Sequence, residues 1–252
     1  MANLSNIEWT EATWNPATGC TKVSTGCKNC YAESLSLRLQ KMRQKKYKNG
    51  FEYTEHESEL DKPLHWKKPR RIFVNSMSDL FHEKATDSFI DAIFHTMMIA
   101  KQHTYQILTK RPQRMKDFID KWISCHGGLE GVPKHIWLGV SVENEEVVDR
   151  IDILKTIPCI RFVSFEPLLD IIEHDLTGIH WAIVGGESGQ GYRPVQEAWV
   201  QILKDQCRWY NVAFFFKQWG GNYPTQYGRQ LDKQTYDEYP QLTVKAMSKH
   251  EV

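Results

Sequence analysis

The chain of 252 residues contains no apolar run that approaches the roughly 18 residues of a membrane helix. Its first residues, MANLSNIEWTE, lack the basic and apolar regions of a signal peptide. Six cysteines are too few for a disulfide framework in a chain of this length, and a net charge of +1 excludes a general attraction to polyanions. Together these absences predict a folded cytoplasmic protein in a reducing compartment, with no membrane partner.

Three of the six cysteines, Cys20, Cys27 and Cys30, lie within eleven positions, and the other three are scattered along the chain. In a reducing compartment such a cluster indicates metal binding or catalysis. A structural zinc site takes four protein ligands, so zinc would need a remote fourth ligand here. An iron–sulfur cluster held by only three cysteines would instead leave one iron open to a small molecule. Gly19 and Gly26, each placed before a cysteine, favour the cluster because a loop around a bulky group needs unusual backbone torsion angles.

Apolar runs typical of buried strands alternate with helical patterns, which is the order of parallel βαβ units. This order predicts an α/β fold with about six to seven parallel strands in a partial or full β/α barrel. Residues 1–220 are expected to form a single barrel domain with the cysteine loop near its start, and residues 221–252 a C-terminal extension. We expect strands at 71–75, 104–108, 136–140, 160–165, 180–184 and 212–216, with a seventh within 9–14. We expect helices at about 31–46, 87–101, 113–124, 145–156 and 196–211.

Three successive predicted strands end in the same way, with a small residue, one spacer and a glutamate. Because the side chains of a strand alternate between two faces, each small residue and its glutamate project to one side at the carboxyl end of the strand. In a β/α barrel this end carries the active site. The three pairs are Ser141 and Glu143, Ser164 and Glu166, and Gly185 and Glu187.

Charged residues of both signs follow the other predicted strands. Asp79, Lys110, Arg111 and Lys217 are expected at the same mouth, where mixed charge indicates a small, highly polar or zwitterionic ligand. Ion pairs across the mouth with a purely structural role would fit the same pattern. The glycines of GGESG at residues 185–189 would let the backbone approach a ligand closely.

Seven strings between residues 14 and 220 carry a resemblance to known families: WNPATGCTKVSTGCKNCYA, FVNSMSDLFH, ILTKRPQRM, WLGVSVEN, FVSFEPLL, IVGGESG and FFFKQWG. As a set they resemble a phage-borne three-cysteine-motif family of unknown function. A three-cysteine loop before a series of β/α units also resembles the radical S-adenosylmethionine (SAM) superfamily. The commoner superfamily spacing has three residues between the first two cysteines, whereas this chain has six; the C-x2-C half matches.

The radical SAM resemblance implies two cofactors and an external electron donor. A 4Fe-4S cluster would be held by Cys20, Cys27 and Cys30, and SAM would bind its open iron. One electron passed to the sulfonium would give a 5′-deoxyadenosyl radical that abstracts hydrogen from a substrate. By analogy with the superfamily, the amino group of SAM would be bound at Ser76, Ser78 and Asp79, its ribose at Ser141 and Glu143, and its methionyl or adenine end at Gly185, Gly186, Glu187 and Ser188.

The residues left for substrate are Glu166, Lys110, Arg111 and Lys217. A basic stretch over residues 37–48 and the phage context of the family favour a nucleic acid or nucleotide as substrate. An extruded base would need an aromatic partner, for which Trp66, Trp219 and Tyr192 are candidates. A partner protein could also take part.

Two further hypotheses stay open at this stage. In the first, the three cysteines and a remote ligand hold zinc in a nucleic-acid-binding module without catalysis. In the second, Glu143, Glu166 and Glu187 do the acid–base work of a hydrolase and the cysteines are incidental.

Overall fold

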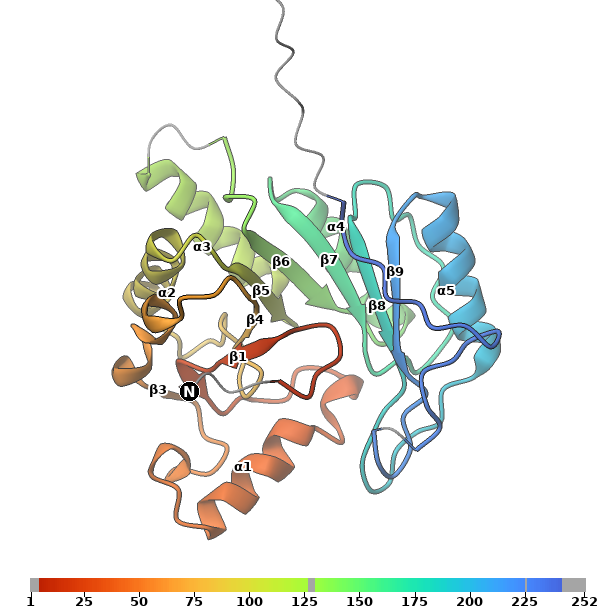
Figure 1. Ribbon diagram of the computed structural model, residues 1–252, viewed down its shortest axis with the longest axis horizontal. Helices are drawn as coiled ribbons and strands as arrows, with labels where there is room; N and C mark the ends of the chain where they lie inside the picture. Colours follow the sequence, from red (N-terminus) through yellow and green to blue (C-terminus); the bar gives the residue numbers. More distant parts are fainter. Residues whose placement is uncertain (1–4, 127–129, 225, 242–252) are drawn as a thin grey trace, which may run out of the picture.

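The computed structural model describes residues 5–126, 130–224 and 226–241. Seven parallel strands form one sheet in the order β1-β4-β5-β6-β7-β8-β9, which curves into an open barrel with helices on its outer face (Figure 1). The prediction of a partial α/β barrel is confirmed, and the seventh strand is the one expected before the cysteines. The strands are β1 (Ala12–Trp14), β4 (Arg71–Val74), β5 (Thr104–Thr109), β6 (Ile136–Ser141), β7 (Ile160–Phe165), β8 (Trp181–Gly185) and β9 (Ala213–Gln218).

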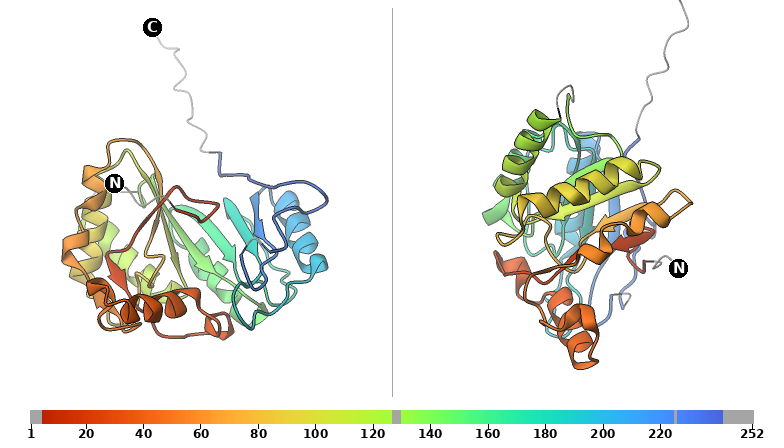
Figure 2. Two further views of the ribbon diagram at one scale, coloured as in Figure 1. Left: turned by 60° about the horizontal axis from the view of Figure 1, so that its bottom comes forward. Right: turned by 90° about the vertical axis from the view of Figure 1, so that its left-hand side faces the viewer.

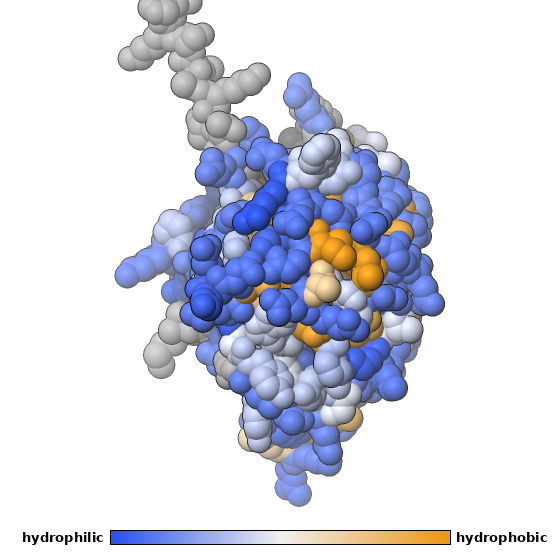
Figure 3. Space-filling model, turned by 90° about the vertical axis from the view of Figure 1, so that its right-hand side faces the viewer, coloured by the Kyte–Doolittle hydropathy of each residue, from blue (hydrophilic) through white to orange (hydrophobic). Residues whose placement is uncertain are grey.

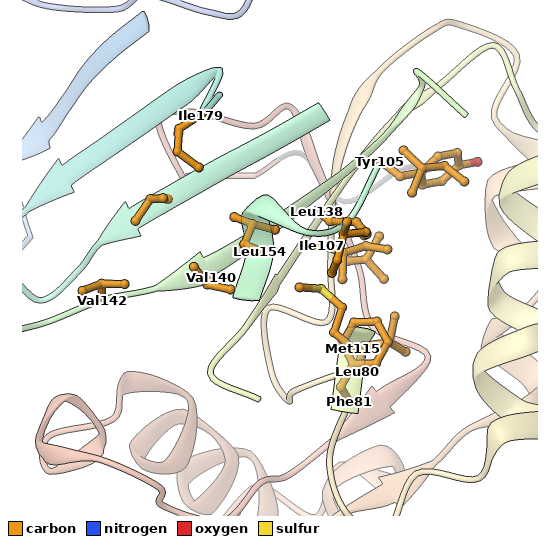
Figure 4. Close-up of a cluster of buried hydrophobic side chains, with 14 of the residues drawn as sticks. Leu80, Phe81, Tyr105, Ile107, Met115, Leu138, Val140, Val142, Leu154 and Ile179 are labelled. Atoms are coloured by element: carbon orange, nitrogen blue, oxygen red, sulfur yellow. The ribbon is translucent and has the colours of Figure 1, made fainter. Parts of the chain in front are cut away.

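Four helices cover the outer face of the sheet, and their amphipathic stripes account for this placement (Figure 2). Outward residues of the strands, such as Ile107, Leu138 and Val140, pack with helix residues such as Met115 and Leu154 in the larger core (Figure 4). The four helices are α2 (Asp87–Ile99), α3 (Pro112–Cys125), α4 (Asp149–Lys155) and α5 (Glu197–Trp209). The helix expected over 145–156 begins as a short 3-10 turn, η5 (Glu145–Val147), before α4.

One helix stands apart from the sheet. α1 (Tyr31–Lys41) follows the cysteine loop and lies beyond the end of the barrel where the strands finish (Figures 1 and 2). Only Ala32 and Ser36 of this helix are buried. Its predicted continuation to residue 46 is interrupted after Lys41 and resumes as a 3-10 turn, η2 (Lys45–Tyr47). A two-stranded antiparallel ribbon, β2 (Ala17–Thr18) with β3 (Thr54–Glu55), joins the chain on either side of this region.

The interior of the barrel is filled at one end by aromatic residues. Inward side chains near the starts of the strands form a second core that includes Trp9, Trp137, Phe162, Trp181 and Phe215. Neighbouring rings pack against one another, as Trp181 does edge-on against Phe215 at a centroid distance of 6.0 Å. This plug closes one end of the barrel.

Gly139 makes room for this plug, because a Cβ at this position would lie 2.5 Å from the Phe162 ring. We expect Gly139→Ala to lower the free energy of unfolding by about 1–3 kcal/mol through overpacking. Urea denaturation followed by fluorescence measures the change, with Ser34→Ala on an exposed helix position as the control within about 0.5 kcal/mol of the parent. Equal stability of Gly139→Ala and the parent would contradict the packing described here.

The chain after β9 returns to the sheet. The Phe216 amide donates to the Tyr236 carbonyl at 3.0 Å, and Phe215 forms an antiparallel bridge with Asp237. The Arg71 guanidinium at the start of β4 lies over the Tyr239 ring, 4.2 Å from the centroid of that ring. The segment after β9 therefore reaches from one edge of the open barrel toward the other. The segment beyond residue 220 thus covers the free edge of β9, and residues 242–252 of the expected extension lie outside the described residues.

The surface over α5 is largely hydrophilic, with small apolar patches (Figure 3). Within the described part of the chain, no helix combines the length and the apolarity needed to cross a bilayer.

Candidate functional site

A cavity of about 420 Å³ opens where the strands end. It exists because the inward side chains change from large rings to small or polar groups along each strand. Two positions after each ring on the same face come Asn75 after Phe73, Ser164 after Phe162, and Lys217 after Phe215. Large rings therefore form the floor, and small or polar side chains form the walls. The predicted site residues that line the cavity are Cys20, Cys27, Cys30, Ser76, Ser78, Asp79, Lys110, Arg111, Ser141, Glu166, Gly186, Glu187, Ser188 and Lys217. Glu143 and Gly185 are not among the lining residues.

The three cysteines lie on the rim of this cavity as free, partly buried thiols. Burial raises the pKa of the Cys20 thiol to about 11 and also raises the pKa of Cys30. Cys27 adds to both shifts, so it lies within electrostatic range of both neighbours.

The spread of the thiols bears on which metal group they fit. In the described residues no three Cys, His, Asp or Glu side chains converge on a point that could hold a metal ion. A single zinc needs four donors at about 2.0–2.3 Å from one point. In an iron–sulfur cluster each thiolate binds a different iron. Three thiols are therefore the type and number of donors that a cluster with one open iron requires, whereas a structural zinc would need a fourth donor.

Asp79 holds the first part of the cysteine loop through an arginine. Its carboxylate accepts from the Thr109 hydroxyl at 2.7 Å and from Arg111 Nη1 at 3.0 Å. Arg111 in turn donates to the Thr21 carbonyl at 3.2 Å and lies 3.5 Å from Cys20 Sγ. This arginine therefore links the end of β5 to the first cysteine.

Glu143 holds the middle of the loop. Its fully buried carboxylate accepts from the Gly26 amide at 3.0 Å and from Arg150 at 3.1 Å, and Lys110 Nζ lies 3.5 Å away. Burial opposes ionisation of this group, but Lys110, Arg150 and the Gly26 amide together keep its pKa below the ordinary value. Both carboxylate oxygens are therefore engaged within the protein, and Glu143 does not line the cavity.

The two loop glycines have different roles. Gly19 has a φ of +82°, as expected for a loop with unusual torsion angles. Gly26 has no such φ, so the predicted reason for this glycine is wrong. Its Cβ would lie 2.8 Å from the carboxyl carbon of Glu143, and glycine is needed there for close approach.

Glu187 holds the last part of the loop. Its carboxylate accepts from Asn29 Nδ2 at 3.0 Å and from the Arg193 amide at 2.8 Å, and it pairs with the Arg193 guanidinium. Arg193 also donates to the Thr25 carbonyl at 3.1 Å. Burial raises the pKa of Glu187, but the bonds from Arg193 and Asn29 outweigh this and lower it. Asp79, Glu143 and Glu187 thus each connect one strand end to one part of the cysteine loop.

A second group of polar atoms lies at the cavity without partners. Glu166 pairs with Lys217 at 2.7 Å through one carboxylate oxygen, and its other oxygen, Oε1, is buried with no hydrogen bond. Asn75 Nδ2, Gln218 Oε1 and Trp9 Nε1 are likewise buried and unpaired, and all four residues line the cavity. Buried polar atoms are nearly always hydrogen-bonded, so these four indicate where a bound molecule would complete the site.

Three of the predicted serines are already bonded within the protein. The Ser76 hydroxyl donates to Asn15 Oδ1 and the Ser78 hydroxyl donates to the Ala17 carbonyl, both at 3.1 Å. The Ser188 hydroxyl accepts from Gln218 at 2.7 Å.

Several functional residues were missed at the sequence level. Asn75 could have been found, because it lies two positions after the inward Phe73 on the same face. Asn29 lies between two of the cysteines but its partner is 158 positions away, and Arg150 pairs with Glu143 across a turn with no motif of its own.

Comparison with known proteins gives a family and a set of distant solved structures. Residues 4–240 match the sequence family described as protein of unknown function (DUF5131). No curated protein matches the chain. Spore photoproduct lyase complexed with dinucleoside spore photoproduct is similar at 12% identity with a TM-score of 0.44. A mutant of that protein with bound AdoMet and dinucleoside spore photoproduct is similar at 10% identity with a TM-score of 0.47. Each comparison covers 82% of this chain and 63% of the solved chain, so this chain spans less than two thirds of their length.

Proposed function

The chain belongs to the family described as protein of unknown function (DUF5131), and from its site we propose that it is a radical SAM enzyme. The observation that carries the proposal is that Cys20, Cys27 and Cys30 are free thiols on a barrel-mouth cavity, whose lining in the described residues contains no other Cys and no His. When bound at Cys20, Cys27 and Cys30, a 4Fe-4S cluster would supply the electron for reductive cleavage of SAM.

The surroundings of the cysteines support a bound cluster. Arg111 donates toward the sulfur of Cys20, and a charge-assisted bond of this kind favours the thiolate that an iron ligand requires. The loop that carries the cysteines is fixed to three strand ends by Asp79, Glu143 and Glu187. A site held on rigid strands keeps its ligands in place without help from the cofactor.

The cavity beside the cysteines supports a small-molecule ligand. Its volume of about 420 Å³ lies in the usual range for sites that enclose one small organic molecule. We propose that Glu166, with its free Oε1, and Lys217 bind the polar groups of SAM or of the substrate. Ser141, Ser76, Ser78, Gly186 and Ser188 stay in the proposal as the cavity wall that SAM would contact, and Gly185 leaves it because this glycine does not line the cavity.

The strand-end carboxylates take a different role from the one that the superfamily analogy implies. We propose that Asp79, Glu143 and Glu187 position the cysteine loop and do not bind SAM directly. Lys110 and Arg111 share this role, because their charged groups point at Glu143 and Asp79. Glu166 and Lys217 are then the main candidates for contact with substrate.

The substrate class that we propose is a nucleic acid or nucleotide. The basic stretch that follows the cysteine loop supports it, because exposed cations beside a cavity favour a phosphate-bearing ligand. An external electron donor is needed to reduce the cluster.

The test of this function uses protein purified without oxygen and reconstituted with iron and sulfide. We expect about four irons and four sulfides per chain, and release of 5′-deoxyadenosine after addition of SAM and dithionite, measured by liquid chromatography. One tightly held zinc in a colourless protein would favour the nucleic-acid-binding module instead. A fully loaded cluster that never cleaves SAM would overturn the radical mechanism.

A further inference from the structure

We infer that the segment from Arg38 to Lys48, called the basic arm below, binds the phosphate backbone of a single-stranded nucleic acid and directs its bases to the barrel-mouth cavity. This inference rests on the proposed function, since it names the substrate class of the same site. Four features of the described residues carry it: charge, placement, shape and the aromatic residues of the opposite rim.

The basic arm concentrates positive charge in a nearly neutral protein. Residues 34–51 contain six cations and no acid, although the net charge of the whole chain is only +1. Lys46 pairs with Glu59 at 2.8 Å. The other five are exposed, and none lies within 4 Å of a carboxylate in the part of the chain that the structure describes. These five are Arg38, Lys41, Arg43, Lys45 and Lys48.

The chain that carries the basic arm is fixed to the residues after two strands. At the start of α1, seven positions before the basic arm, the Tyr31 hydroxyl donates to the Ser76 carbonyl at 2.5 Å, just after β4. At the far end of the basic arm, Lys46 Nζ donates to the Asn15 carbonyl at 2.6 Å, just after β1. α1 contributes only two buried residues to the protein, so the need to cover the sheet does not explain it. The exposed cations are therefore held at the mouth of the barrel by specific contacts.

The basic arm also borders a hollow of about 800 Å³. Its lining includes Arg43, Lys45, Lys46, Lys48 and His56. The two acids in this lining are already engaged, because Glu59 binds Lys46 and Lys62 and Glu55 accepts from the Thr86 amide. A concave surface with free cations suits the phosphates of a nucleic acid strand.

Exposed aromatic residues lie on the rim opposite the basic arm. Tyr223 is 72% exposed and Tyr227 is 56% exposed, and Pro224 between them in this segment lines the cavity. Tyr227 and Tyr192 are joined through their hydroxyls at 3.3 Å. Successive unpaired bases stack on exposed aromatic rings with little dependence on sequence. A single strand whose phosphates contact the basic arm and whose bases stack on the tyrosines of the other rim would lie across the cavity.

The test is binding of a fluorescein-labelled 20-nucleotide single strand of mixed sequence, measured by anisotropy with the full chain and without SAM. We expect the variant with Arg38→Gln, Lys41→Gln, Lys45→Gln and Lys48→Gln to bind at least ~10-fold more weakly at 0.1 M salt. The slope of log K against log salt should fall by about 3, because each lost phosphate contact on a single strand removes about 0.7.

A matched control removes the same charge at the other end of the barrel. Lys67, Lys68, Lys101 and Lys134 are exposed and precede strands, so their replacement by glutamine should leave binding within about twofold of the parent. A second variant, Tyr223→Ala with Tyr227→Ala, should weaken binding without changing the salt slope.

The outcomes separate this inference from the proposed function. Release of 5′-deoxyadenosine in the absence of nucleic acid should be the same in the glutamine variant and the parent. Three results would each overturn the basic arm as a nucleic-acid site. The control variant could lose as much binding as the arm variant, or the parent could fail to bind the oligonucleotide. The parent could also bind vesicles of phosphatidylserine and phosphatidylcholine more tightly than the oligonucleotide. Normal oligonucleotide binding with no SAM cleavage would overturn the proposed function alone.

Discussion

The Cys27→Ala variant is expected to lose its iron–sulfur cluster and to release no detectable 5′-deoxyadenosine from SAM. Cys27 is one of the three free thiols that line the cavity, so its loss leaves only two sulfurs to hold a cluster. Replacement of a residue that hydrogen-bonds a metal ligand typically lowers metal affinity or activity by roughly 10–100-fold. Loss of a direct ligand should have a larger effect. Iron content and visible absorbance after anaerobic reconstitution measure the effect.

The control for this variant is Cys125→Ser. Cys125 is also a free thiol, but it is exposed at the end of α3 and does not line the cavity. It should keep full iron content and full SAM cleavage. A Cys27→Ala protein with the iron content of the parent would show that the cysteines do not hold the cluster.

The second large effect is expected for Glu143→Ala. This change leaves the buried Arg150 guanidinium without its carboxylate and the Gly26 amide without its acceptor. Removal of one partner from a buried ion pair typically costs about 3–5 kcal/mol, so urea denaturation should show a fall of that order in the free energy of unfolding. Because the cysteine loop also loses a tether, we expect less cluster per chain although all three cysteines remain.

Two further variants serve as comparisons for Glu143→Ala. Asp91→Ala removes an exposed acid from α2 and should change stability by less than about 0.5 kcal/mol. Glu143→Gln keeps an acceptor for Gly26 but loses the charge that faces Arg150, and it should fall between Glu143→Ala and the parent. A Glu143→Ala protein with normal stability and normal cluster content would contradict a positioning role and would leave room for direct contact of this residue with SAM.

The strands and helices could be predicted from the sequence because their patterns are local. Every predicted strand is present within a few residues, and the run at 9–14 supplies β1. The helix after the cysteines is shorter than predicted, because Arg43 adopts a left-handed φ of +56° that interrupts the helix after Lys41. The alternation of inward residues also placed Ser141, Ser164 and Glu166 at one mouth.

The partners of the strand-end acids could not be predicted in this way. Glu143 binds an amide 117 positions earlier, and Glu187 binds Asn29 158 positions earlier. Spacing in one sequence does not reveal contacts made by a distant loop that folds back over a barrel. The pattern therefore predicted neither what these carboxylates bind nor that Glu143 would lie outside the cavity lining.

Long-range hydrogen bonds fix the short cysteine loop over the mouth of the barrel. Arg111, Glu143 and Arg193 each reach a different part of the loop; the first two lie directly after strand ends, and Arg193 lies in the loop after β8. Aromatic rings form the floor of the cavity, and the cysteines lie on its rim. Glu166, which has an unpaired buried oxygen, also lines this cavity.

The central claim is that three cysteines hold the cluster and one iron is left for SAM. The most direct measurement is electron paramagnetic resonance of the reduced, reconstituted protein before and after addition of SAM. We predict a [4Fe-4S]⁺ signal whose g-values shift when SAM is added, because SAM binds the open iron. A signal that SAM leaves unchanged at saturating concentration would show that a fourth ligand already occupies that iron, and it would contradict the account.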